Sequence, residues 1–252
     1  MLHFFIRKVV QGVLLLLITS AAAFFLLSSS GSDAFTSLRE NPQVSAATIE
    51  KLRASYGLDR PVIERYGAWL ASAVRADLGE SFYYQVPVTG LVLVRFWSTA
   101  LLAFAAIGLA CVVAVGLSFA NVRYRSRTLS IFIDAVILIF ASTPRIVISL
   151  FSLAVLVSGA INSVFLLSTI SLAVPLVAIL LAQFGQSLND AMHEDFIRTA
   201  RAKGLSETTI ILRHAMRAAI NPALTLFGLS LGALLGGSVI VETVIGRPGI
   251  GS

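Results

Sequence analysis

Charged residues and cysteine are scarce in this sequence. Asp, Glu, Lys and Arg account for 13% of its 252 residues, whereas hydrophobic residues account for 57%. Soluble domains are about 25% charged. A chain this apolar cannot bury its side chains in one aqueous core, so we expect a lipid bilayer as its solvent. The one cysteine, Cys111, lies within an apolar run, which excludes an internal disulfide and a Cys-rich metal site.

Motifs for nucleotide and metal chemistry are also missing. No GxxxxGK[ST] stretch is present, so we do not expect the chain to hold nucleotide phosphates in a P-loop, and no HExxH stretch indicates a zinc site. Its three histidines, His3, His193 and His214, have no carboxylate at ligand spacing and are interpreted as surface residues. We therefore expect no metal and no cofactor bound by this chain. The net charge of +6 indicates basic loops at one membrane face and not nucleic-acid binding.

Five apolar segments are long enough to cross a bilayer, which takes about 20 helical residues. The first segment could also be a cleaved signal peptide. Its apolar stretch exceeds the roughly 7–15 residues of such peptides, so we favour a retained anchor. The predicted fold class is all-α, a polytopic bundle of transmembrane helices. The five segments are 9–29, 96–122, 129–157, 160–183 and 220–245.

The basic residues between these segments fall on one side of the membrane, which the positive-inside rule assigns to the cytoplasm. The N-terminus and the loop 184–219 are then cytoplasmic, and 30–95 and 242–252 lie outside. The residues that set this orientation are Arg7, Lys8, Arg123, Arg125, Arg127, Arg198, Arg201, Lys203, Arg213 and Arg217.

Three parts follow from this topology. Residues 1–29 form a cytoplasmic start and first anchor, 30–95 an extracytoplasmic helical cap, and 96–252 a transmembrane core that includes the loop 184–219. Within the cap, Leu52 and Tyr56 share one helix face, as do Ile63, Tyr66, Leu70 and Val74. Gly57 indicates the end of one helix and Pro61 the first turn of the next.

Two ionisable residues lie inside the third apolar segment. Asp134 is near its cytoplasmic start and Arg145 lies deeper, directly after Pro144. Pro144 cannot donate to the carbonyl of Phe140, so we expect a kink in this helix. A charge at this depth should face protein or water. Both residues could line a transport pathway, or Arg145 could pair with Asp134 or a helix carbonyl, and the sequence does not decide between these.

Residues 228–232 match the pattern GxSxG of hydrolase nucleophiles, with Ser230 in the nucleophile position. That motif requires a turn between a strand and a helix, whereas this copy lies in the middle of an apolar segment. Glycines at every fourth position instead allow helices to approach closely in lipid. We therefore interpret Gly228, Gly232 and Gly236 as a helix-packing face, and keep an intramembrane enzyme as an alternative.

A short charged helix is predicted in the loop 184–219. Acidic residues precede basic ones in LNDAMHEDFIRTARAKGLS, as the helix dipole favours. Gly204 is the expected left-handed terminator, and Ser206 can cap a second helix. Small side chains, Ala200 and Ala202, would allow this helix–Gly–helix elbow to dock on a partner. A solvated connector is the alternative.

The stretch DFIRTARAKGLSETTIILRHAMRAAINPALT resembles the cytoplasmic EAA loop of ABC-importer permease subunits. It is most similar to the dipeptide, oligopeptide and nickel branch, in which TARAKGLS is followed by a His ten residues after the glycine and then by a Pro. Gly204, His214 and Pro222 have this spacing. YGLDRPVIERYGAWLASAVRADLGES and GGSVIVETVIGRPGIG resemble two further elements of that branch, so the resemblance covers most of the chain.

The resemblance implies the fold of a type I ABC importer permease in a bacterial inner membrane. It implies a second permease subunit, two ATPase subunits that bind ATP and Mg²⁺, an extracytoplasmic solute-binding protein and transport by alternating access. The coupling helix, which would sit on an ATPase, would comprise Arg198, Thr199, Ala200, Arg201, Ala202, Lys203 and Gly204. Besides these protein partners, we expect membrane lipid and no nucleic acid.

The sequence departs from the family pattern in three places. Arg198, Thr199 and Ala200 stand where the general motif has Glu-Ala-Ala, as is usual in the peptide branch. The link after the third apolar segment is short. A sixth span is expected beyond Pro248, which leads us to expect that the natural protein continues. A membrane scaffold that binds a cytosolic partner through the elbow remains a further alternative to a permease of peptides or similar small solutes.

Overall fold

The computed structural model describes residues 2–29, 57–81, 84 and 86–252. The chain forms two compact units, Met1–Leu91 and Val92–Ser252. Helices account for nearly all of the regular structure in the described residues, and four of them are long and apolar enough to cross a membrane. A fifth candidate is a pair of helices with a sharp bend between them. The predicted all-α membrane fold is therefore confirmed.

The first unit contains α1 (Leu2–Ser29) and α4 (Val62–Ala73), with α1 apolar along its whole length. The two helices meet through aromatic side chains. The hydroxyl groups of Ser20 and Tyr66 are 2.9 Å apart, and the rings of Phe24 and Tyr66 lie edge to face with centroids 5.5 Å apart. Gly57 adopts a left-handed φ of +64°, while the helix that it was predicted to end lies outside the described residues. The prediction for Leu52 and Tyr56 lies outside the described residues.

The start of α4 differs slightly from the prediction. Pro61 occupies the position just before the helix and not its first turn. Its fixed φ, here −50°, suits this position, and its carbonyl accepts the first helical hydrogen bonds from Glu64 and Arg65.

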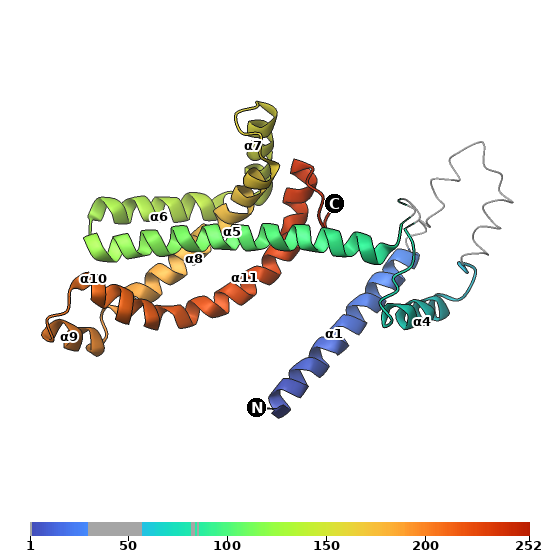
Figure 1. The fold of residues 1–252 in the computed structure, drawn as a ribbon, viewed down its shortest axis with the longest axis horizontal. Helices are drawn as coiled ribbons and strands as arrows, with labels where there is room; N and C mark the ends of the chain where they lie inside the picture. The colour runs from blue at the N-terminus through green and yellow to red at the C-terminus, as the bar shows by residue number, and fades with distance from the viewer. Residues whose placement is uncertain (1, 30–56, 82–83, 85) are drawn as a thin grey trace. The chain divides into compact units, whose positions relative to one another are not determined.

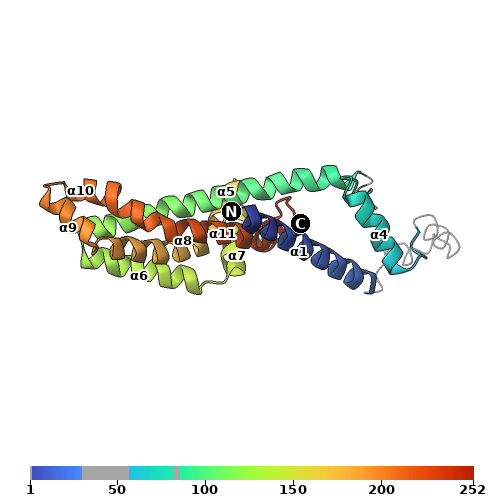
Figure 2. The ribbon, with the colours of Figure 1, turned by 90° about the horizontal axis from the view of Figure 1, so that it is seen from below.

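In the second unit the long helices α5, α6, α8 and α11 run back and forth beside one another, and α7 stands at a steep angle to α6 (Figure 1). Figure 2 shows the same helices from a perpendicular direction. α8 is central, because α6, α7 and α11 all pack against it. The helices are α5 (Val88–Tyr124), α6 (Arg127–Ser142), α7 (Arg145–Val157), α8 (Val164–Ala191), α9 (Asp195–Ala202), α10 (Glu207–Ile210), the π-helix η1 (Ile211–Ala215) and α11 (Met216–Ile245).

The third apolar segment consists of two helices with a sharp bend between them. α6 ends at Ser142, α7 begins at Arg145, and their axes differ by 96°. Thr143 is extended, with ψ of 118°, because a residue that precedes proline is disfavoured in the helical region. Pro144 then occupies the position just before α7, where it needs no N–H donor and its carbonyl accepts from Val147 and Ile148. The kink predicted at Pro144 is therefore confirmed, and the structure shows that the helix is interrupted there.

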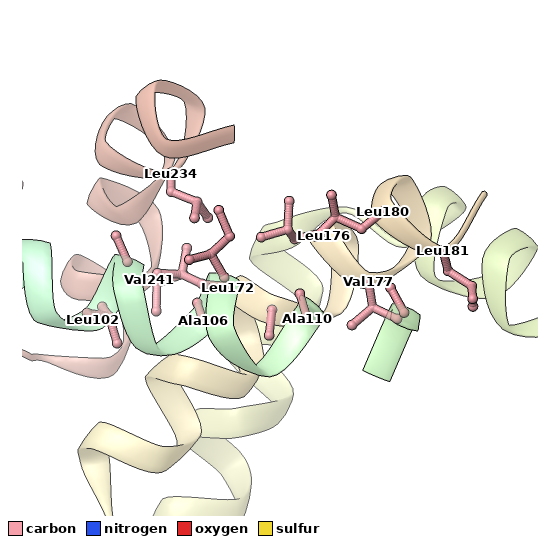
Figure 3. Packing of buried hydrophobic residues seen from close by; sticks show 14 of the residues in the cluster. Leu102, Ala106, Ala110, Leu172, Leu176, Val177, Leu180, Leu181, Leu234 and Val241 are labelled. Atoms are coloured by element: carbon pink, nitrogen blue, oxygen red, sulfur yellow. The ribbon is translucent and has the colours of Figure 1, made fainter. Parts of the chain in front are cut away.

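The core of the second unit lies between α5, α8 and α11 (Figure 3). α5 contributes a stripe of fully buried alanines that allows the helix backbones to approach closely. The stripe comprises Ala103, Ala106, Ala110 and Ala114. Leu172, Leu176 and Leu181 of α8 fill the space opposite.

Hydroxyl groups add polar contacts between the helices. Ser171 of α8 donates to Ser152 of α7 over 2.8 Å, and both side chains are buried. Hydroxyls of this kind can bond across helices where no water competes. The core is therefore built as lipid-embedded helices require, with small and hydroxylated residues at the contacts.

Candidate functional site

The helix–Gly–helix elbow forms as predicted from the sequence, with a shorter first helix. α8 continues to Ala191 and includes Asp190, so the separate helix α9 is only the eight residues Asp195–Ala202. Gly204 has a φ of +77°, in the left-handed region that a glycine terminator supplies. The side chain of Ser206 then caps α10 by accepting from the amide of Thr209 over 3.3 Å.

α9 has a strongly divided surface. Ile197 and Ala200 are buried against the ends of α8 and α11, in a second apolar cluster that includes Phe184 and Ile211. The opposite face is open, and the side chain of Arg198 is 80% exposed. Ala200, which was predicted to contact a partner, instead seats α9 on its own bundle. Thr199, Arg201, Ala202, Lys203 and Gly204 are exposed.

Two large apolar side chains beside the predicted residues are also exposed. Phe196 is 42% exposed and Leu205 39% exposed, one at each end of the elbow's first helix. Exposed apolar groups among charges are typical of protein interfaces. The prediction for the elbow considered only small and basic residues. Phe196 and Leu205 could have been included, because neither falls at the positions of α9 that are buried.

An ion pair braces the two arms of the elbow. Arg201 donates from Nε to one oxygen of Glu207 over 2.7 Å and from Nη2 to the other over 3.2 Å. This bidentate geometry fixes the relative orientation of the two side chains. The Arg201 hydrogen bonds hold the pKa of Glu207 below its ordinary value, and the charges of Arg125 and Arg123 act in the same direction.

The elbow is also attached to two long helices. Arg123, at the end of α5, donates from Nε to the hydroxyl of Thr208 over 3.3 Å. α10 passes through the π-helix η1 into α11 without a break, and Ile211 and Ala215 of η1 are fully buried. Pro222 accordingly lies in the second turn of α11 and not at its start. π-helical turns are rare and frequently occur at functional sites.

The two ionisable residues of the third apolar segment are not brought together. Asp134 is exposed on α6, and no ion pair joins it to Arg145 among the described residues. Arg145 begins α7, and its guanidinium lies against Gly237 of α11, where a methyl group would have no room. Its buried Nε has no hydrogen-bond partner in the described part of the chain.

The predicted packing glycines face open space. Among the described residues, a methyl group placed on Gly228, Gly232 or Gly236 would meet nothing within 4 Å besides α11 itself. Ser230 lies in the interior of α11 and not at a turn between a strand and a helix, which removes the geometric basis for a nucleophile.

A buried carboxylate at the far end of α11 was not predicted. Glu242 is 1% exposed and accepts from Thr99 Oγ1 of α5 over 2.6 Å and from the amide of Gly251 over 2.9 Å. Thr99 Oγ1 accepts in turn from the amide of Ile250 over 3.0 Å. A buried polar group is stable only when hydrogen-bonded, and here both carboxylate oxygens are satisfied. We call Thr99, Glu242 and Gly251 the latch.

The segment after α11 is held at further points. Ser98 donates to the carbonyl of Pro248 over 2.8 Å, and Arg247 donates to the Ser98 carbonyl over 3.2 Å. The Arg247 guanidinium also lies over the ring of Phe165, 4.8 Å from its centroid. Residues 246–252 therefore connect α5, α8 and α11. The stretch VETVIGRPGIG carried the resemblance, but nothing in it alone indicated Thr99 as the partner of Glu242.

Known proteins similar to this chain are membrane permeases. Residues 106–252 match the family described as binding-protein-dependent transport system inner membrane component, and residues 1–103 match the N-terminal region of such membrane components. The glutathione transport system permease protein GsiC of Escherichia coli K12 and that of Shigella boydii serotype 4 are each 30% identical over 222 residues. That alignment covers 83% of this chain and 72% of the relative in both cases.

A solved structure has a similar fold. It is described as a crystal structure of an amino acid ABC transporter with histidines, and it has 20% sequence identity and a TM-score of 0.54. The match covers 65% of this chain and 76% of the other. At this identity the likeness concerns the arrangement of the helices and not the solute.

The helical bundle, the elbow and the two family matches agree with the resemblance seen in the sequence. This chain belongs to the binding-protein-dependent transport system inner membrane components, so it is a multi-pass permease subunit of an ABC importer, and ATP is bound by separate partner subunits.

Proposed function

We propose that this permease imports peptides or similar small solutes by alternating access, with α9 seated on an ATPase partner. The observation that carries the proposal is the divided surface of α9. One face is buried on its own bundle through Ile197 and Ala200, and the other presents Phe196 and Arg198 outward. A partner that binds the exposed face and moves would displace α9, and α9 would move together with α8 and α11 because its other face is packed against them.

The path from α9 into the bundle is continuous. The Arg201–Glu207 pair joins α9 to α10, and α10 continues through η1 into α11. α11 has 30 residues and so extends for about 45 Å. Its far end is joined to α5 through Glu242 and Thr99. Displacement of α9 would therefore move α11 and the outer half of α5 together, as rigid-body alternating access requires.

The orientation follows from the basic residues of the sequence. The N-terminus and the elbow face the cytoplasm, where two ATPase subunits bind ATP with Mg²⁺, and the segment 246–252 faces outward. A solute-binding protein delivers solute on that outer side, and a second permease subunit completes the pathway. The open glycine face of α11 (Gly228, Gly232 and Gly236) packs on that second subunit.

The solute proposed is a small peptide that carries a carboxylate, the class to which glutathione belongs. The relatives named above are glutathione permeases. Arg145 supports the same class, because its guanidinium lies at the break between α6 and α7 and its Nε has no partner in the described residues. A cation in an apolar region favours a carboxylate as its counter-ion. Asp134, exposed on α6, faces either the pathway or the second subunit.

The test compares two matched substitutions in the assembled importer. Phe196→Ser removes an exposed apolar group from α9, and Leu212→Ser removes one of similar exposure, 54%, from η1. We expect Phe196→Ser to lower solute-stimulated ATP hydrolysis at least about tenfold, since buried aromatic anchors contribute about 2 kcal/mol or more to interfaces. Leu212→Ser should leave it within about twofold. Both variants should insert into the membrane normally.

A second pair tests the backbone of the elbow. Gly204→Leu cannot adopt a φ of +77° without strain, whereas Gly204→Asn tolerates that conformation. Stimulated hydrolysis should be lost in the first and largely retained in the second. Unchanged coupling in both Phe196→Ser and Gly204→Leu would contradict a coupling role and favour a connector or scaffold.

A further inference from the structure

A polar cleft lies where α5 and α6 meet. Its volume is about 570 Å³, within the roughly 300–1,000 Å³ of small-molecule sites. Asn121, Arg125, Arg127 and Ser130 line one side, and Asn189 and Arg201 the other. We propose that this cleft binds the phosphate of an anionic phospholipid headgroup.

The charge of the cleft suits a phosphate. Arg125, Arg127 and Arg201 contribute three guanidinium groups, and guanidinium binds phosphate oxygens in a bidentate manner. Only Arg201 is paired, with Glu207. Neither Arg125 nor Arg127 takes part in an ion pair within the part of the chain that the structure describes. The influence of Arg125 on the pKa of Glu207 indicates that this positive field extends across the cleft.

The neutral lining adds donors of the right kind. The side-chain amides of Asn121 and Asn189 and the hydroxyl of Ser130 can donate to phosphate or glycerol oxygens. Val122 and the buried Met192 form an apolar part of the lining. A headgroup that carries both a charge and an attached chain would match such a mixed surface.

The position of the cleft favours lipid over a soluble ligand. The turn at 125–126 joins the candidate span α5 to α6, the first helix of the bent pair, so we place it where α5 leaves the hydrocarbon. Tyr124 is 70% exposed at this turn, as expected of an aromatic residue at the level of the headgroups. Basic pockets between helices at this level bind anionic headgroups in membrane proteins.

The proposed ATPase contact lies elsewhere on the elbow. Its exposed apolar residues, Phe196 and Leu205, do not line the cleft, and Arg201 is the one α9 residue that does. A lipid in the cleft would therefore lie beside the elbow and not under the partner. The proposal rests on the charge and place of the cleft and does not depend on which solute is carried.

Binding is tested on the assembled importer in detergent, with dioctanoyl-phosphatidylglycerol and dioctanoyl-phosphatidylcholine as probes. We expect the anionic lipid to bind, and Arg125→Gln/Arg127→Gln to weaken it at least about tenfold, since each charged hydrogen bond is worth that order. Arg213→Gln/Arg217→Gln removes the same charge from exposed positions outside the cleft and should change binding less than twofold. Arg125→Lys/Arg127→Lys keeps the charge but not the bidentate geometry, so it should bind the anionic lipid more tightly than the Gln variant and less tightly than the parent importer. This order of affinities would show that the Gln variant loses the site and not the fold.

Four results would overturn the proposal. One is equal binding of the two lipids. Another is competition by inorganic phosphate at concentrations similar to the lipid, which would identify a site for free phosphate. The third is a loss of lipid binding in Arg213→Gln/Arg217→Gln as large as that in Arg125→Gln/Arg127→Gln, which would show that binding depends on the net charge of the protein and not on the cleft. An assembled importer that binds no anionic lipid at all would mean that the ATPase covers the cleft, and this too would count against it.

Discussion

Thr99 Oγ1 donates a 2.6 Å hydrogen bond to Glu242 Oε1, and the two residues are 143 positions apart in the chain. Both side chains are buried, Thr99 at 0% and Glu242 at 1% exposure. This contact fastens the N-terminal half of α5 to the last turn of α11. The two helices therefore cannot separate there unless a buried carboxylate loses a hydrogen-bond donor.

Thr99→Val should weaken the latch while preserving its shape. The substitution removes one donor to Glu242 and the acceptor of the Ile250 amide, so we expect a loss of about 1–3 kcal/mol in stability. Thermal unfolding of the detergent-solubilised importer measures it. Thr225→Val, at an exposed position of α11, is the control and should change the midpoint little. Equal midpoints for the two variants would show that the latch adds no stability.

Gly251→Ala should be more damaging than the loss of the hydroxyl. A methyl group at this position would overlap the Cα atom of Val239, and a backbone atom cannot move aside as a side chain can. We expect the segment 246–252 to detach, with faster amide hydrogen exchange at Ile250 and Gly251. In Gly116→Ala, where the added methyl meets nothing within 4 Å, exchange of that segment should stay as in the parent protein.

Gly237→Ala should displace the Arg145 guanidinium without unfolding the bundle. The added methyl would occupy the place of Nη1, which lies at the end of a flexible side chain. If Arg145 contacts the solute, uptake of a tripeptide with a free carboxylate should fall several-fold in both Gly237→Ala and Arg145→Gln. Uptake of the same peptide as its amide should fall less. Identical losses for the two peptides would instead assign Arg145 a structural role.

The Arg201–Glu207 pair predicts a pH dependence that is confined to acid. The pKa of Glu207 is lowered in the folded chain, so its contribution is fully present above the unfolded value, about 4.3, and is lost as the pH falls through the lowered one. Both side chains are more than a third exposed, which limits the pair to under about 1 kcal/mol. The protection of the amides at 203–207, relative to their intrinsic exchange rates at each pH, should fall at low pH in the parent chain and should be low at all pH values in Glu207→Gln. Arg201→Glu/Glu207→Arg should partly restore protection at neutral pH.

Much of the fold could be predicted from local patterns. Length and hydropathy located the spans, and Gly204 and Ser206 located the elbow, because a left-handed glycine and a helix cap are properties of single positions. The size of the break at Pro144 could not be predicted in this way. A proline disrupts one helical turn, but the angle between the two pieces depends on what α7 packs against, and that is α8 and α11.

The site was only partly accessible to sequence reasoning. The exposed side of α9 follows from the helical spacing of its apolar residues. Ala200 was nevertheless assigned to the partner-binding face, because its small side chain was taken to allow close docking, whereas it is buried against the bundle. Glu242 and Thr99 could not be paired, since no local pattern relates residues so far apart. Arg145 and Asp134 were natural partners by charge, but the bend at Pro144 gives them different surroundings.

The π-helical turn at Ile211–Ala215 has a consequence for how such chains can diverge. A π turn, with bonds from i to i+5, is equivalent to an α-helix that has gained one residue. Loss of a single residue from this stretch can be absorbed by reverting to α-helical bonding, with the elbow and the membrane span each keeping their own register. The junction thus offers a spacer of adjustable length, and evolution can retune the elbow without rebuilding the helix that crosses the bilayer.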